Sequence, residues 1–304
     1  MCTADYLDHS PELRVLPASE WRAAARAHRE RVEPLVGPYV ERRAAGRAHP
    51  VIDFLFTYYG HKPSQLQRWH PGFGVGLRGA GEYRGARGYW EVPGERGVFA
   101  ADPGYLVKRR ETIEFVATLL ARTSARPAQL SCFGLHEWAM VYRAEEVRHQ
   151  RVPLRLGRVG TDAVVESMSL RCTHFDAFRF FTPEAVPLNV EPLTRADQVA
   201  REQPGCLHAN MDLYKWGFKL APLISSDLLL DCFELACTAR ELDMRASPYD
   251  LADLGYEPIR IETPAGRADY VRAQAAIAET ANGLRERLRA ACADLVAAQA
   301  RIDG

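Results

Sequence analysis

A long segment with helical periodicity, residues 264–300, constrains the fold of this chain more than any other feature. It begins at Thr263 and Pro264, and a capping residue followed by proline at the first helical position is typical of a helix start. An apolar stripe then follows, with the spacing of one face of an α-helix: Leu284, Leu288, Cys292 and Leu295. We therefore expect one long helix over these residues.

Helical periodicity also covers most of the remaining chain. We expect a first helix from near Ser19, which Pro34 should kink or end, and a short helix after Pro50. The other expected helices share apolar residues at helical spacing and span 109–124, 128–145, 194–202, 206–221 and 226–244.

One stretch, residues 169–180, alternates as a strand does. If it is a strand, one face carries Leu170, Cys172, His174, Asp176, Phe178 and Phe180. The sequence therefore predicts a mainly α (α+β) protein: a helical bundle-like single domain over residues 1–304 with a small central β element.

The composition is that of an ordinary globular protein, with 47% hydrophobic and 26% charged residues. Lys+Arg and Asp+Glu both number 39, and this balance weighs against a dedicated nucleic-acid binder, which is usually basic. The seven cysteines form no CxxC pair and favour reduced thiols. There is no apolar signal core and no run of the ~20 apolar residues that span a bilayer. We expect a cytoplasmic protein without a membrane partner.

Residues 61–90 form a segment rich in glycine, arginine and aromatic residues, which we expect to be a loop. Its Gly74-x-Gly76-x-x-Gly79 resembles a dinucleotide fingerprint, but no expected strand precedes it and no helix follows. Its basic residues are Lys62, Arg68, Arg78, Arg84 and Arg87, against the single acid Glu82. Cations of this kind neutralise phosphates, and the interleaved aromatic rings could stack on unpaired bases. The alternative is a surface loop whose aromatic side chains pack inward.

His174 and Asp176 are two residues apart on the apolar face of the expected strand. Burying such groups without partners costs about 1–3 kcal/mol each. Metal ligation or acid–base catalysis would explain them, and so would a hydrogen bond between them or to nearby backbone.

A second polar stripe lies on the helix expected at 206–221, where His208, Asp212, Lys215 and Lys219 are spaced by four, three and four residues. The carboxylate could orient the histidine, or both could bind a metal; the alternative is a solvated face. Apolar residues adjoin this stripe closely, which favours a largely buried helix.

Two further histidine motifs remain. His136 and Glu137 lie in the helix expected at 128–145, and Glu146 and His149 form an ExxH spacing. Di-iron bundles use two ExxH motifs, so the single one here does not predict such a site. One hypothesis is therefore an enzyme that acts on a small molecule with a divalent metal (iron, zinc or manganese) bound by His136, His174, Asp176 and His208.

Four blocks resemble the signature blocks of a bacterial family labelled 3-methyladenine DNA glycosylase. They are HPVIDFLFTYYGHKPSQLQRWHPG (49–72), CTHFDAFRFFTPEA (172–185), HANMDLYKWGFKL (208–220) and LDMRASPYDL (242–251). The chain lacks the signature block of helix-hairpin-helix glycosylases. The resemblance implies a hydrolase that excises alkylated bases from DNA and needs no cofactor.

Base excision requires a flipped base held between aromatic faces and a carboxylate near the sugar. Under this resemblance Trp138, Tyr214 and Trp216 would supply the faces, and Asp176 or Asp212, with His174, would carry out catalysis. Lys215, Arg78 and Arg84 would contact the DNA. A third hypothesis is a ligand-binding protein without enzymatic activity.

Overall fold

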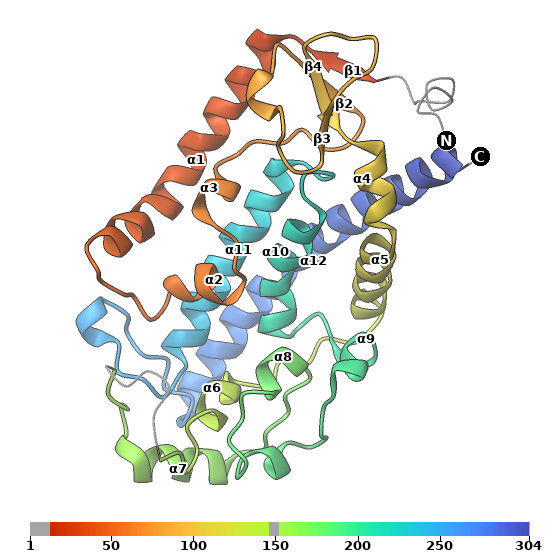
Figure 1. Cartoon of the computed structure of the whole chain (residues 1–304). Helices are drawn as coiled ribbons and strands as arrows, with labels where there is room; N and C mark the ends of the chain where they lie inside the picture. The colour runs from red at the N-terminus through yellow and green to blue at the C-terminus, as the bar shows by residue number, and fades with distance from the viewer. Residues whose placement is uncertain (1–12, 146–151, 304) are drawn as a thin grey trace.

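The computed structural model describes residues 13–145 and 152–303. Most of these residues lie in helices, and a small four-stranded sheet lies at one end (Figure 1). The prediction of a mainly α protein with a small β element is confirmed.

The long helices are α1 (Ala18–Ala44), α5 (Arg110–Ser124), α10 (Leu207–Leu220), α11 (Ser226–Arg245) and α12 (Pro264–Asp303). The shorter helices are α2 (Asp53–Tyr58), α3 (Pro63–Leu66), α4 (Pro103–Lys108), α6 (Leu135–Ala139), α7 (Gly157–Ser167), α8 (Phe175–Phe178) and α9 (Gln198–Arg201). The strands are β1 (Arg14–Leu16), β2 (Val75–Arg78), β3 (Tyr89–Glu91) and β4 (Val98–Ala101).

Helix α10 lies at the centre of the fold, against α11, α12 and α5 (Figure 1). Most of its residues are buried, which is the expected environment of a helix that is apolar on most sides. Phe233 of α11 and Leu288 of α12 are fully buried in the same core. Within the described residues, no helix combines the length and the apolar character needed to cross a bilayer.

The sheet has the strand order β1-β2-β4-β3, with β1 and β2 parallel and the other pairs antiparallel. It packs against the N-terminal part of α1 through a separate small core that includes Trp21, Tyr83 and Phe99. The Trp21 indole donates a hydrogen bond to the Arg78 carbonyl at 2.9 Å. The segment 61–90 therefore contributes α3, β2 and β3, and several of its aromatic rings face inward.

The prediction of a strand at 169–180 is wrong. His174 has an extended backbone, but the Phe178 amide donates to the His174 carbonyl at 3.0 Å and the chain turns into α8. Leu170 makes only an isolated bridge with Asn189, so no neighbouring strand holds this segment extended. His174 and Asp176 are therefore not side by side on one strand face, and the β structure forms between residues 14 and 101 instead.

Two helix boundaries also differ from expectation. Helix α1 does not end at Pro34 but continues through Pro38, because Val32 and Val36 on either side are fully buried against the core. In the expected helix 128–145 only α6 forms, since the backbone at Phe133 and Gly134 has positive φ values of 50° and 70° just before it.

The long helix α12 should stabilise the fold through its buried stripe. We expect Leu288→Ala to lower the free energy of unfolding by about 2–5 kcal/mol, because it leaves a cavity in a closely packed core. Val159→Ala is the control: Val159 is 85% exposed, and a change at such a site costs within about 0.5 kcal/mol. Denaturant unfolding followed by circular dichroism measures both, and equal stability of the two variants would contradict the packing described here.

Candidate functional site

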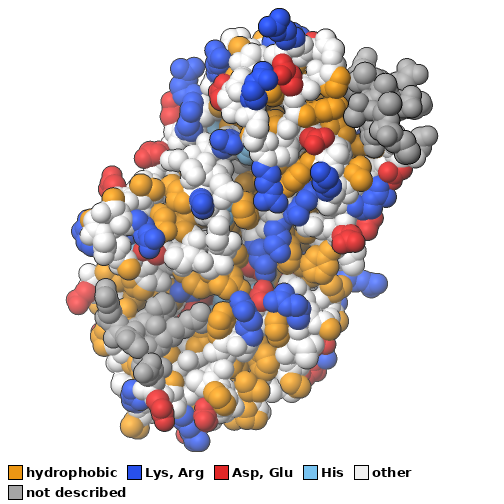
Figure 2. Space-filling model, in the orientation of Figure 1, with side chains coloured by type: hydrophobic (Ala, Val, Ile, Leu, Met, Phe, Trp, Pro, Cys, Tyr) orange, Lys and Arg blue, Asp and Glu red, His pale blue; other side chains and the backbone are white. Residues whose placement is uncertain are grey.

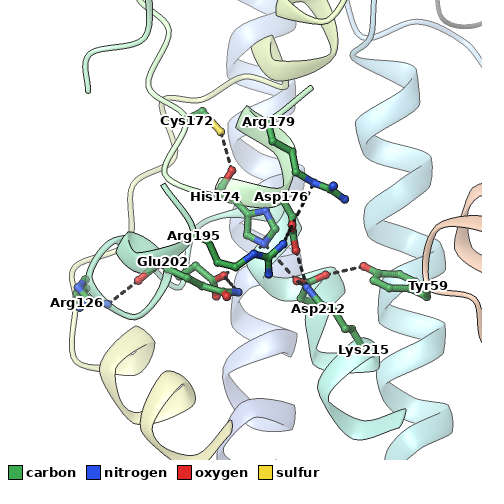
Figure 3. Close-up of polar contacts among 11 residues, drawn as sticks. Tyr59, Arg126, Cys172, His174, Asp176, Arg179, Arg195, Glu202, Asp212 and Lys215 are labelled. Atoms are coloured by element: carbon green, nitrogen blue, oxygen red, sulfur yellow. Dashed lines mark hydrogen bonds and ion pairs between the residues drawn. The ribbon is translucent and has the colours of Figure 1, made fainter. Parts of the chain in front are cut away.

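Lys215 on α10 lies between two carboxylates from different parts of the chain (Figure 3). Its Nζ is 2.8 Å from Asp176 Oδ2 and 2.8 Å from Asp212 Oδ2. Burial alone would lower the pKa of Lys215, but the two aspartates outweigh it and raise the pKa. Lys215 is therefore a permanent cation that binds α8 to α10, and not a neutral amine.

Asp176 is surrounded by cations. Besides Lys215, its Oδ1 lies 3.2 Å from Arg179 Nε and 3.5 Å from Arg195 Nη2 (Figure 3). Burial opposes ionisation, yet the hydrogen bond and charge of Lys215 lower the pKa of Asp176. This carboxylate is ionised, and the Arg179 and Arg195 side chains that contact it extend into solvent.

Asp212 lies deeper and has a different set of partners. Tyr59 donates its hydroxyl to Asp212 Oδ1 at 2.9 Å, and His174 Nε2 lies 3.3 Å from Oδ2. Burial would raise the pKa of Asp212, but Lys215 and His174 lower it well below its ordinary value. Asp212 is thus a fixed negative charge at the centre of this network.

His174 connects Asp212 to Glu202, whose Oε1 is 3.5 Å from His174 Nε2. Burial would lower the pKa of His174, but the carboxylates of Asp212 and Glu202 outweigh it and raise the pKa. Burial raises the pKa of Glu202 despite His174 nearby. The Gln198 amide donates to Glu202 Oε1 at 2.6 Å and fixes the carboxyl group.

A second buried cluster lies where α6 meets α11. His136 Nε2 is 2.7 Å from Asp243 Oδ1, and Arg240 Nη1 donates to Asp243 Oδ2 at 2.9 Å and to Glu137 Oε1 at 2.8 Å. Burial lowers the pKa of His136, but Asp243 more than offsets it and raises the pKa well above its usual value. Every charged group in this cluster has an opposite charge beside it.

His208 on α10 joins the two clusters. Its ring centroid is 4.4 Å from that of His136 and 5.4 Å from that of His174. Burial, followed by the charge of His136, lowers the pKa of His208 well below its ordinary value, so this imidazole is neutral. Three histidines and several carboxylates therefore form one continuous buried system along α10.

Two groups in this system have metal-ligand geometry: His136, His208 and Asp243 form one, and His174, Glu202 and Asp212 form the other. Within each group the possible ligand atoms lie within 4.8 Å of one another, and every residue is buried.

A cleft of about 770 Å³ opens beside α10. Its basic lining residues are Arg68, Arg87, Arg109, Arg195 and Lys219, and Glu111 is the acidic one among the described lining residues. Its aromatic lining residues are Tyr105, Phe115, Trp216 and Phe218, with two histidines, His61 and His70. Lys and Arg side chains gather in the middle of the face in Figure 2, over α10 and toward α4 and α5.

The structure brings together three of the four residues of the metal hypothesis: His136, His174 and His208. Asp176 approaches the group from the other side, as it lines a small cavity with His208 and Glu137 but pairs with Lys215. The residues of the ExxH spacing, Glu146 and His149, lie outside the described residues.

The residues predicted to contact DNA are dispersed. Trp216 lines the cleft, whereas Trp138 and Tyr214 are fully buried, with Trp138 Nε1 donating to the Ala246 carbonyl at 2.8 Å. Arg78 and Arg84 lie at the sheet, where they pair with Glu95 at 3.4 Å and with Glu91 at 3.1 Å. These two arginines do not line the cleft.

Sequence reasoning missed Asp243, Arg240 and Glu202 in the buried system and Arg109 and Arg195 in the cleft. A pattern on α11 could have revealed two of them. Arg240 and Asp243 stand one turn apart among apolar residues of that helix, and a charge on an apolar helix face needs a partner.

No family model, no curated protein and no solved structure matches this chain.

The pairing of Lys215 gives a test of this network. We expect Lys215→Met to lower the free energy of unfolding by about 3–5 kcal/mol at pH 7, because it removes the cation that lies between two buried carboxylates. Both aspartates have lowered pKa values in the folded state. Their stabilisation is therefore present above about pH 4 and is lost as the pH falls below it, so the deficit of the variant should shrink on acidification.

Urea unfolding across this pH range measures the effect. Lys219→Met is the matched control, since Lys219 stands one turn further along α10 without an ion pair among the described residues. A deficit for Lys215→Met that stays constant with pH would contradict the ion-pair network.

Proposed function

We propose that this protein binds nucleic acid in the basic cleft and acts on it as an N-glycosidic bond hydrolase. The observation that carries the proposal is the composition of the cleft lining. Its described residues include five cationic side chains, four aromatic rings and one carboxylate. The resemblance of the four sequence blocks to glycosylase-labelled proteins supports the same function.

The cations of the cleft are available to an anionic ligand. Within the described part of the chain, no carboxylate pairs with Arg68, Arg87, Arg109 or Lys219. Burial and the nearby Lys215 lower the pKa of Lys219, and an anion in the cleft would offset both effects. Phosphate groups are the anions that such an array of cations neutralises.

The aromatic residues of the cleft favour a ligand with planar rings. Two lysines lie close to the Trp216 ring, with Lys215 Nζ at 4.7 Å and Lys219 Nζ at 4.9 Å from its centroid, and the Phe115 ring centroid is 5.4 Å away. Base–aromatic stacking contributes about 1–3 kcal/mol per base and tolerates any base. A phosphate-bearing chain with an extruded base fits these features together.

Arg195 links the cleft to Asp176. It lines the cleft, is 69% exposed, and contacts Asp176 Oδ1 at 3.5 Å. In the proposed reaction phosphate groups draw the solvent-facing Arg195 and Arg179 side chains away from Asp176 Oδ1, and the carboxylate then faces the sugar. The carboxylate then stabilises positive charge on the sugar while the electron pair of the bond between C1′ and nitrogen leaves with the base. Water supplies the hydroxyl group at C1′, and its proton is released.

The cleft should contribute a defined part of the salt dependence of binding. We expect the double variant Arg68→Ala, Arg87→Ala to bind a single-stranded oligonucleotide more weakly. The slope of log K against log salt should fall in magnitude by roughly 1.4, because two phosphate contacts to a single strand are lost. Fluorescence anisotropy over a range of salt concentrations measures this. Arg272→Ala on α12 is the control, since its side chain is 71% exposed outside the cleft. Absence of binding by the wild type at low salt would refute the proposal.

The role of Asp176 gives a separate prediction. Asp176→Asn should reduce base release from alkylated DNA by about 100-fold or more, because the developing charge on the sugar loses its carboxylate. DNA binding should persist, since the cleft cations are unchanged. Asp269→Asn, on the exposed surface of α12, is the matched control. Single-turnover base release with thermal melting of each variant measures the effect, and full activity of a folded Asp176→Asn protein would rule out this role.

A further inference from the structure

His208 is a buried imidazole without a hydrogen-bond partner among the described residues. It is 8% exposed, and its contacts are the rings of His136 and His174. Its side chain borders two small cavities, so its imidazole is open to a small ligand. His208 is not among the lining residues of the nucleic-acid cleft.

The groups that face His208 include good metal ligands. A ring nitrogen of His208, one of His136 and a carboxylate oxygen of Asp243 all lie within 4.8 Å of one another. Two ligand atoms at 2.0–2.2 Å from one ion are at most about 4.4 Å apart, so small side-chain rotations bring all three onto a common point. His136 and Asp243 are 2% and 0% exposed, so bulk water does not compete for these positions.

We propose that His136, His208 and Asp243 bind one divalent transition-metal ion that holds α6, α10 and α11 together. Two imidazoles and one carboxylate suit zinc and other first-row ions of that class rather than magnesium or calcium, which prefer all-oxygen sites. The ion would give His208 the partner that it lacks among the described residues.

The neighbours of the three ligands support this assignment. Cys132 Sγ lies 3.8 Å from His136 Nδ1 and can accept that N–H, so Nε2, which faces Asp243 Oδ1 at 2.7 Å, is the nitrogen that would bind the ion. Arg240 holds the second oxygen of Asp243 at 2.9 Å and leaves Oδ1 directed at His136. Such contacts fix the orientation of ligands in known metal sites.

The surroundings favour a structural ion. Two small cavities, of about 10 and 30 Å³, border His208. The smaller is also lined by His136 and His174, and the larger by Glu137 and Asp176. Each has room for about one or two water molecules, which can complete the coordination, and neither admits a substrate.

The second candidate group, His174, Glu202 and Asp212, is different because it already contains a cation. Lys215 Nζ lies 2.8 Å from Asp212 Oδ2, the same oxygen that faces His174 at 3.3 Å. An ion placed there would meet the ammonium group directly. The proposal is therefore one ion per chain, and Asp212 is not a ligand.

Metal content and metal binding test the proposal on the full-length protein. We expect about one zinc or iron ion per chain in protein purified without chelators. After chelator treatment, Co²⁺ should bind with the absorption bands of a nitrogen- and oxygen-ligated ion, and Zn²⁺ should displace it. Metal removal should lower Tm, and Zn²⁺ should restore it, because an ion that binds only the folded state stabilises it.

The variant His208→Gln is the decisive one, because this side chain makes no hydrogen bond whose loss would unfold the protein. We expect it to weaken Co²⁺ binding by more than about 100-fold. Two controls should bind Co²⁺ as the wild type does: Asp212→Asn, and His28→Gln, which replaces a buried histidine of α1 whose Nε2 is 2.8 Å from the Leu66 carbonyl.

Three outcomes would overturn the proposal: wild-type protein that holds no metal and binds no Co²⁺, His208→Gln that binds Co²⁺ as tightly as the wild type, or Asp212→Asn that loses the ion. These measurements involve no DNA. Failure of base excision would thus leave the metal assignment intact, and absence of a metal would leave the cleft unaffected.

Discussion

Lys215 lies between the carboxylates of Asp176 and Asp212 in a part of the molecule that water scarcely reaches. A charge in such surroundings is tolerated only when an opposite charge lies beside it, because the loss of hydration costs several kcal/mol per ion. Helix α10 is central and carries two such charges, so the chain around it must provide partners. Asp176 meets this requirement by joining α8 to α10 through Lys215, while Ala177 and Phe178 of α8 are buried in the apolar core.

The same helix connects three different environments. Trp216 and Lys219 face the basic cleft, Asp212 and Lys215 form the ion-pair network, and His208 lies among the buried histidines. One helix can reach all three environments because its side chains point in all directions from a rigid backbone. A ligand in the cleft would therefore lie close to the ion-pair network, with Arg195 as the side chain shared by both.

Much of this arrangement follows from local patterns. The periodicity of 264–300 and the spacing of His208, Asp212 and Lys215 predicted α12 and a largely buried polar helix, and both are present. Where the local pattern was ambiguous, the prediction failed. The alternation around His174 and Asp176 fits a strand as well as an irregular segment with one helical turn, and a strand forms only where a neighbouring strand accepts its hydrogen bonds. None lies there among the described residues.

The sequence by itself determined the helical class, the burial of α10 and the residue types available for chemistry, because these depend on the order of apolar and polar residues within one element. Tertiary structure alone decided which charges meet. Asp243 and His136 are more than a hundred positions apart in the sequence, yet their side chains are 2.7 Å apart. Their meeting depends on how α6 packs against α11, and periodicity within one helix carries no information about the partner that will lie across the interface.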